Sequence, residues 1–175
     1  TLKKINVRFC LAVFDTKTNI LCLGRDRFGL STLFYTCFDG LIAFSSRAKG
    51  LLALPGVSNE LDSRFLKAAA ATNYRFLDTN NSLSPFRNIK QVPPGTIVRF
   101  DDKKMQTEQF ASLTIDEIRR SNKPTREEYI QLFNRDVSKR LRAEKKPIFS
   151  LSVGLDCSSV VSMAKQITKK KQTAI

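Results

Sequence analysis

The sequence predicts an α+β fold that continues into an α/β fold. An Asp-Gly pair at residues 39–40 lies between two apolar runs, which is the strongest short-range signal for an antiparallel hairpin. Near the other end, an extended run, a tight loop, a helical stretch and a second extended run follow one another, an order typical of a parallel α/β sheet. We therefore expect a β-rich domain over residues 1–110, a linker over 111–124 and an α/β domain over 125–175.

The first domain is expected to begin with two hairpins and to continue with two helices. Four extended apolar runs predict four antiparallel strands, at residues 8–14, 20–24, 33–38 and 41–45. A helix over 46–54 should stop before Pro55-Gly56, and Asp62 should cap a second helix that ends at about residue 73. A last strand is expected over 97–100, after a Pro-Pro-Gly turn.

The second domain is expected to alternate between helix and strand. Thr125 and Glu128 form a capping-box pattern, and apolar residues at helical spacing follow it to about residue 141. After this helix we expect a strand at residues 148–152. A loop and a helix should follow over 153–171, ending at three lysines, and another strand should start at 172–175.

Composition narrows the chemistry that the chain can carry out. The sequence has no histidine, which excludes Ser-His and Cys-His catalysis and histidine-ligated metals. Its four cysteines include no CxxC pair, so we expect free thiols. No apolar run approaches the roughly 18 residues of a membrane span, and we expect a cytoplasmic protein. The formal charge is +14, of which +9 falls in residues 119–175; this basic segment suits nucleotide phosphates, an acidic partner or nucleic acid.

Two polar loops are candidates for a functional role. The Arg25-Asp26-Arg27 run predicts a loop that supports the sheets through ion pairs rather than a catalytic site. The loop at 152–158 leaves a strand and begins a helix, so its amides and the helix dipole favour an anion such as phosphate. Ser152 and Ser158 add hydroxyl groups, and Asp156 either caps the helix or meets a cation. An ordinary βα turn with Asp156 as the N-cap is the alternative.

A set of ordered motifs carries a family resemblance. The loop resembles the SGGLDS pyrophosphate loop of N-type ATP pyrophosphatases, with Val153 in place of a glycine and Cys157 in place of a serine. The other motifs resemble the glutamine-dependent asparagine synthetase family and occur in that family's order. They are RFCLAVFD (8–15), GRDRFGLSTLFY (24–35), FSSRAKGLLALPGV (44–57), IKQVPPGTIVRF (89–100) and KRLRAEKKPIFSLSVGLDCSS (139–159).

The resemblance implies a fold and an activity. The fold would be the C-terminal half of an Ntn-type glutaminase antiparallel β-sandwich, followed by the first strand-loop-helix of an ATP-pyrophosphatase domain. The activity would be an ATP- and Mg²⁺-dependent amide ligase, in which ammonia from glutamine attacks an acyl-adenylate of aspartate or another carboxylate. The implied ATP- and pyrophosphate-binding residues are Leu151, Ser152, Val153, Gly154, Leu155, Asp156, Cys157 and Ser158. No catalytic residue and no protein metal ligand is implied in this segment.

Departures from the family pattern keep other interpretations open. Val153 places a branched side chain where a backbone should approach phosphate, and Val7 and Arg47 replace a usual Gly and Glu. The family's N-terminal Cys nucleophile has no counterpart here, so we expect a chain that begins mid-protein and that alone neither hydrolyses glutamine nor makes asparagine. The alternatives are a degenerate non-catalytic relative, a ligase that closes another amide (a peptide or β-lactam cyclase) and a nucleic-acid binder, the last the weakest. The resemblance also allows a homodimer and gives no reason for a membrane partner.

Overall fold

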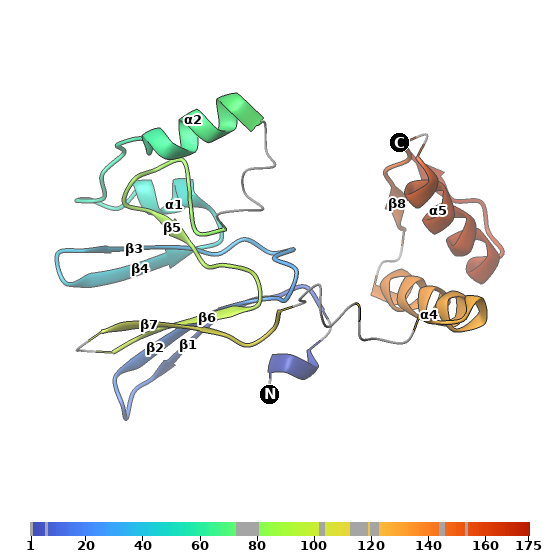
Figure 1. The fold of residues 1–175 in the computed structure, drawn as a ribbon, viewed down its shortest axis with the longest axis horizontal. Coiled ribbons are helices and arrows are strands. Elements are labelled where there is room, and N and C mark those ends of the chain that lie inside the picture. Colours follow the sequence, from blue (N-terminus) through green and yellow to red (C-terminus); the bar gives the residue numbers. More distant parts are fainter. Residues whose placement is uncertain are drawn as a thin grey trace. The chain divides into compact units, whose positions relative to one another are not determined.

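The computed structural model describes residues 2–5, 7–72, 81–101, 104–112, 119, 123–143, 146–152 and 154–175 (Figure 1). The chain divides into two compact units, residues 1–114 and 115–175. Among the described residues, no helix combines the length and the apolar character that crossing a bilayer requires. All four cysteines are free thiols, as predicted.

The first unit contains two antiparallel sheets. The larger has the order β1-β2-β6-β7, and the smaller has the order β4-β3-β5. The strands are β1 Cys10–Asp15, β2 Ile20–Arg25, β3 Phe34–Phe38, β4 Leu41–Ser45, β5 Lys90–Gln91, β6 Thr96–Phe100 and β7 Met105–Gln109. Both predicted hairpins are confirmed, with β1 paired to β2 and β3 to β4. The four strands of the first 45 residues nevertheless divide between two sheets, and β5 and β7 were not predicted.

The two sheets form two layers that share one core (Figure 1). Leu23 of β2 and Val98 of β6 come from one sheet, and Tyr35 of β3 comes from the other. The Tyr35 ring meets the Phe100 ring edge to face, with centroids 5.4 Å apart and planes at 71°. Such contacts add to the free energy gained by burying the aromatic area. The core therefore depends on residues far apart in the sequence.

Two short helices lie on the outer side of the smaller sheet (Figure 1). Helix α1 spans Ala48–Leu52, so it is shorter at both ends than predicted. Helix α2 spans Ser63–Thr72, and its predicted end at residue 73 lies outside the described residues. Asp62 caps α2 as predicted, because its carboxylate accepts the amide protons of Arg64 (2.8 Å) and Phe65 (3.4 Å). The remaining short helix, η1, spans Leu2–Lys4.

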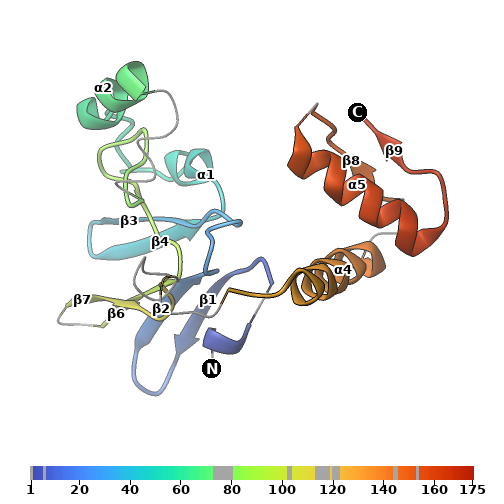
Figure 2. The same ribbon diagram turned by 45° about the vertical axis from the view of Figure 1, so that its right-hand side comes forward.

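The second unit pairs two short parallel strands beside two helices. The elements are α4 Arg126–Ala143, β8 Ile148–Phe149, α5 Leu155–Thr168 and β9 Thr173–Ala174. The capping box of α4 is confirmed: the Thr125 amide donates to Glu128 (2.8 Å), and the Glu128 amide donates to the Thr125 hydroxyl (3.2 Å). Figure 2 shows α5 beside the β8–β9 pair, and β8 and β9 run parallel, as the predicted order of elements requires. β8 is shorter than predicted, although the Leu151 amide still donates to the Ile175 carbonyl (2.9 Å).

Candidate functional site

The loop between β8 and α5 exposes the start of a helix. Gly154 is the N-cap, with extended backbone (φ −72°, ψ 151°) and no side-chain cap. The first turn closes when the Ser158 amide donates to the Gly154 carbonyl (3.2 Å). The amides of the three residues between them have no acceptor within the helix. Because the helix dipole adds partial positive charge at the same place, this turn can accept an anion.

Both predicted hydroxyl groups are engaged inside the loop. The Ser152 hydroxyl accepts the Gly154 amide proton (3.3 Å) and donates to the Cys157 thiol (3.4 Å). The Ser158 hydroxyl donates back to the Gly154 carbonyl (2.9 Å). A bound phosphate would therefore compete with Ser152 for the Gly154 amide, and Ser158 would have to change rotamer to donate to it.

Asp156 does not cap the helix, so that interpretation of the residue is wrong. The N-cap lies two residues earlier, at Gly154, and Asp156 occupies the first turn with an exposed side chain. A carboxylate there stabilises the helix through the dipole. The position leaves the carboxylate free to meet a cation from solvent, the other role that the sequence suggests.

The rest of the predicted loop is open to solvent within the second unit. The Leu155 side chain is 81% exposed, and Leu151 is also exposed. Val153 lies outside the described residues, so its predicted strain stays a prediction. The Cys157 thiol is half-buried, and the hydrogen bond from Ser152 lowers its pKa below the ordinary value. The loop thus brings together amides, hydroxyls, one carboxylate and a thiol of lowered pKa over a short stretch of chain.

A metal ion at this loop would need ligands from a bound nucleotide as well as from the protein. Among the described residues, no group of three His, Cys, Asp or Glu side chains gathers to hold a metal. Mg²⁺, however, commonly uses only one or two carboxylates together with substrate phosphates and water. Asp156 and the oxygens of a bound nucleotide fit that pattern.

The Arg25-Asp26 loop is held in the first unit by hydrogen bonds to the backbone in addition to the predicted interaction between charges. The Asp26 carboxylate accepts amide protons from Phe28, Leu30 and Ser31 at 2.9–3.1 Å. Arg25 donates to the backbone carbonyls of Ser31, Val92 and Gly29 at 2.5–2.9 Å. Burial alone raises the pKa of Asp26, but the amide hydrogen bonds outweigh it and the pKa is lowered. Backbone groups thus provide the hydrogen bonds of both residues, and the Asp26 charge also favours the charged form of Arg25.

Comparisons with known proteins match both units. Residues 1–111 match the glutamine amidotransferase domain family. Asparagine synthetase [glutamine-hydrolyzing] 3 of Bacillus subtilis is 26% identical over 164 residues, which cover 91% of this chain and 26% of that protein. Putative asparagine synthetase [glutamine-hydrolyzing] 1 of Methanocaldococcus jannaschii is 24% identical over 169 residues (93% and 28%), and Amidase chyE of Penicillium rubens is 24% identical over 167 residues (93% and 24%). The chain spans about a quarter of the length of these relatives.

Proposed function

We propose that this chain, which belongs to the glutamine amidotransferase domain family, is part of a glutamine- and ATP-dependent amide ligase of the asparagine synthetase type. The observation that carries the proposal is the extent of the similarity. The family match ends at residue 111, whereas the asparagine synthetases are similar over 91–93% of the chain. The second unit, with its strand-loop-helix-strand order, is therefore included in that similarity.

In the proposed reaction, a carboxylate oxygen of the acceptor attacks the α-phosphorus of ATP. The bond to the β-phosphate oxygen breaks, and pyrophosphate leaves. Ammonia from glutamine then attacks the acyl carbon; AMP leaves and the nitrogen loses a proton. The result is an amide, and the energy of the nucleotide has been used to activate the carboxylate.

The loop before α5 would bind the phosphates. The amides of Leu155, Asp156 and Cys157 would be the donors, because they precede Ser158, whose amide makes the first hydrogen bond within the helix. The Ser152 hydroxyl would release the Gly154 amide when a phosphate oxygen takes its place. Asp156 would hold Mg²⁺ together with the nucleotide, and the metal ion would neutralise charge on the departing pyrophosphate.

The acceptor of the amide is a separate question. The names of two relatives above specify asparagine, while the name of a third specifies an amidase. That third similarity favours an enzyme acting on a different amide as the second candidate. Aspartate and other carboxylates can be compared directly by measuring pyrophosphate release with each.

A titration of the purified protein with ATP and Mg²⁺ tests the nucleotide proposal. We expect saturable binding that Gly154→Val weakens at least tenfold, because a branched side chain would stand where the phosphate approaches. Ser159→Val is the matched control: Ser159 lies one turn into α5 and its hydroxyl donates only to the Leu155 carbonyl (2.7 Å), so ATP affinity should change less than twofold. Val153→Gly should tighten binding. Equal affinities for the Gly154 and Ser159 variants, or no saturation, would refute the proposal.

A further inference from the structure

The first unit contains a cleft that the proposed function does not use. It has a volume of about 450 Å³, within the range of small-molecule sites. Its apolar wall comes from β3, β6 and β7, and its charged rim comes from the start of α2 and from the segment that leads into β5. The residues that matter for its chemistry are Tyr35, Val98, Met105, Arg64, Arg87 and Lys90.

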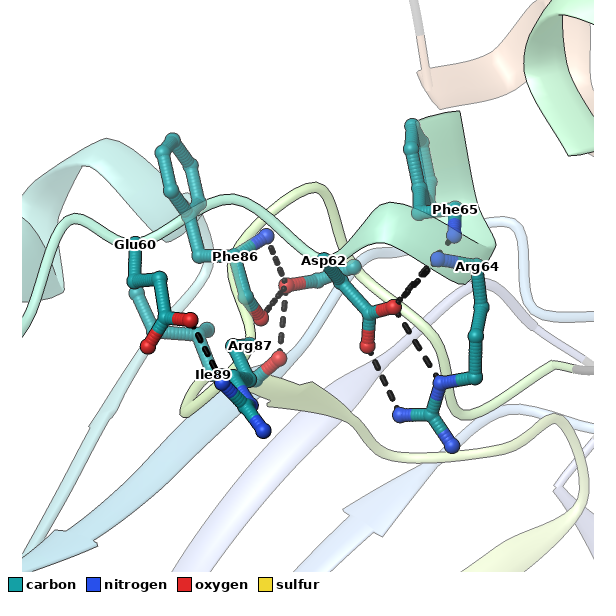
Figure 3. Close-up of polar contacts among 8 residues, drawn as sticks. Glu60, Asp62, Arg64, Phe65, Phe86, Arg87 and Ile89 are labelled. Carbon is teal, nitrogen blue, oxygen red and sulfur yellow. Dashed lines mark hydrogen bonds and ion pairs between the residues drawn. The ribbon is translucent and has the colours of Figure 1, made fainter. Parts of the chain in front are cut away.

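Each of two arginines on the rim pairs with a carboxylate (Figure 3). Arg64 donates from Nε (3.2 Å) and Nη2 (2.7 Å) to Asp62, which is itself buried. Arg87 donates from Nη1 to Glu60. A guanidinium group has five N–H donors in a fixed plane, so each arginine keeps donors for a ligand while its carboxylate partner limits its movement. Both side chains are largely exposed (73% for Arg64 and 63% for Arg87), so their remaining donors are accessible to a ligand.

The charge on the rim is not balanced. Arg64 and Arg87 each have one acidic partner, but Lys90, in β5, has no acidic partner among the described residues. Asp62 is the single acidic residue among those that line the cleft. The rim therefore carries excess positive charge, and a ligand with a negative group would supply the missing anion.

The wall behind this rim suits an apolar body. Met105 is the exposed part of this wall, and among the described residues the Tyr35 hydroxyl donates to the Met105 sulfur (3.6 Å), a weak acceptor. Ser84, also in the lining, is already used, since its hydroxyl contacts the carbonyls of Phe86 (3.0 Å) and Ile89 (2.6 Å). Ser84 shapes the turn, whereas Tyr35 can still offer a hydrogen bond to a ligand.

We propose that this cleft binds a small organic anion, in which a carboxylate or phosphate group meets Arg64, Arg87 and Lys90 and an aromatic or aliphatic body lies against the Tyr35–Met105 wall. The site is independent of the proposed ATP loop. It would give the amidotransferase unit a second ligand site, for a metabolite that need not take part in the reaction.

Titration of the purified protein with phenyl phosphate and with benzoate, followed by calorimetry, tests the site. Inorganic phosphate and phenol separate the anionic and apolar contributions, and each should bind at least tenfold more weakly than phenyl phosphate. Arg87→Gln and Lys90→Gln should each weaken phenyl phosphate at least fivefold. Lys90 is exposed and makes no side-chain hydrogen bond among the described residues, so its variant should remain folded by circular dichroism.

Arg99→Gln is the matched control, because Arg99 is exposed on β6 between the buried residues Val98 and Phe100 and so points to the opposite face. It should leave the affinity unchanged. If Arg99→Gln weakens binding as much as the rim variants do, the binding reflects the positive charge of the protein as a whole, and the cleft proposal fails. If Gly154→Val removes phenyl phosphate binding and the rim variants do not, the anion belongs to the ATP loop and the cleft proposal fails. Loss of ATP binding with phenyl phosphate retained would reject the proposed function alone.

Discussion

Two loops of this protein gather backbone amides in opposite ways. In the loop of residues 25–31, the buried Asp26 carboxylate accepts three amide protons and is 2% exposed. In the described part of the loop of residues 151–158, the Asp156 carboxylate is exposed, and the Ser152 hydroxyl accepts the amide proton of Gly154. The first loop thus contains its own anion, whereas the second leaves amides open at the start of a helix.

A supporting loop and a binding loop differ in where the negative charge beside their amides comes from. A cluster of amides attracts negative charge wherever it occurs. If a side chain of the same loop supplies that charge, the loop is rigid and has no capacity for a ligand. If the side chains satisfy only part of the cluster, an external phosphate can complete it.

The largest expected effect comes from removing the internal anion. Asp26→Ala leaves three part-buried amides without their acceptor, and since a buried unsatisfied donor costs about 1–3 kcal/mol, we expect a loss of about 2–3 kcal/mol. Urea unfolding combined with hydrogen exchange at β2 and β6 would measure it. Asp156→Ala in the open loop should cost less than about 1 kcal/mol. Similar losses in the two variants would show that the loops do not differ as described.

The glycines of the two loops give the next effect. Gly29 has φ +64°, and an added Cβ would lie 2.8 Å from Arg25 Nη2 and from Pro94 Cγ. Gly29→Ala should therefore cost about 1–3 kcal/mol. Gly154 has φ −72° and its nearest neighbour, Ser152 Oγ, would lie at 3.2 Å. Gly154→Ala should cost less, and an equal fall in melting temperature for both would contradict the distinction.

The start of α2 extends the comparison to pH. Asp62 caps this helix, and the hydrogen bond from Arg64 lowers its pKa to about 2. Because the folded pKa lies below the unfolded value of about 3.9, the stabilisation is complete above that value and is lost as the pH falls toward 2. In Asp62→Asn, the free energy of unfolding of the first unit should depend less on pH in this range. Replacing the cap by Asp62→Ala should cost about 1 kcal/mol at neutral pH. A pH profile of the first unit's stability that is the same for Asp62→Asn and the unmodified protein would contradict the role of the cap.

The smallest effect on stability is expected for the Ser152 hydroxyl. Ser152→Ala removes the hydrogen bond that lowers the pKa of Cys157, so the thiol should titrate at a higher pH. The pH dependence of alkylation at Cys157, followed by peptide mass spectrometry, would show the shift. Ser159→Ala, whose hydroxyl donates to the Leu155 carbonyl instead, should leave the profile in place. A profile that is the same for Ser152→Ala and the unmodified protein would mean that Ser152 does not act on the thiol.

Local signals predicted much of the chain. The Asp39-Gly40 turn requires positive φ at both residues, and both have it (46° and 75°), which produced the β3–β4 hairpin. The Asp62 cap and the Thr125–Glu128 box marked two helix starts, because each joins groups only two or three residues apart. β7 escaped prediction, since all five of its side chains are exposed and no apolar alternation marks them.

The sequence by itself determined the hairpins, the helix starts, the order of elements and the family to which the chain is similar, because each depends on near neighbours or on motifs in fixed order. Packing alone brought the Asp26 carboxylate to the amides of its own loop, turned Ser152 back onto Gly154, and placed Arg64 and Arg87 in the lining of one cleft. These outcomes depend on which polar atoms come within hydrogen-bond distance after the chain has packed. That distance is set by the core, where residues such as Tyr35 and Phe100 meet across 65 positions of sequence.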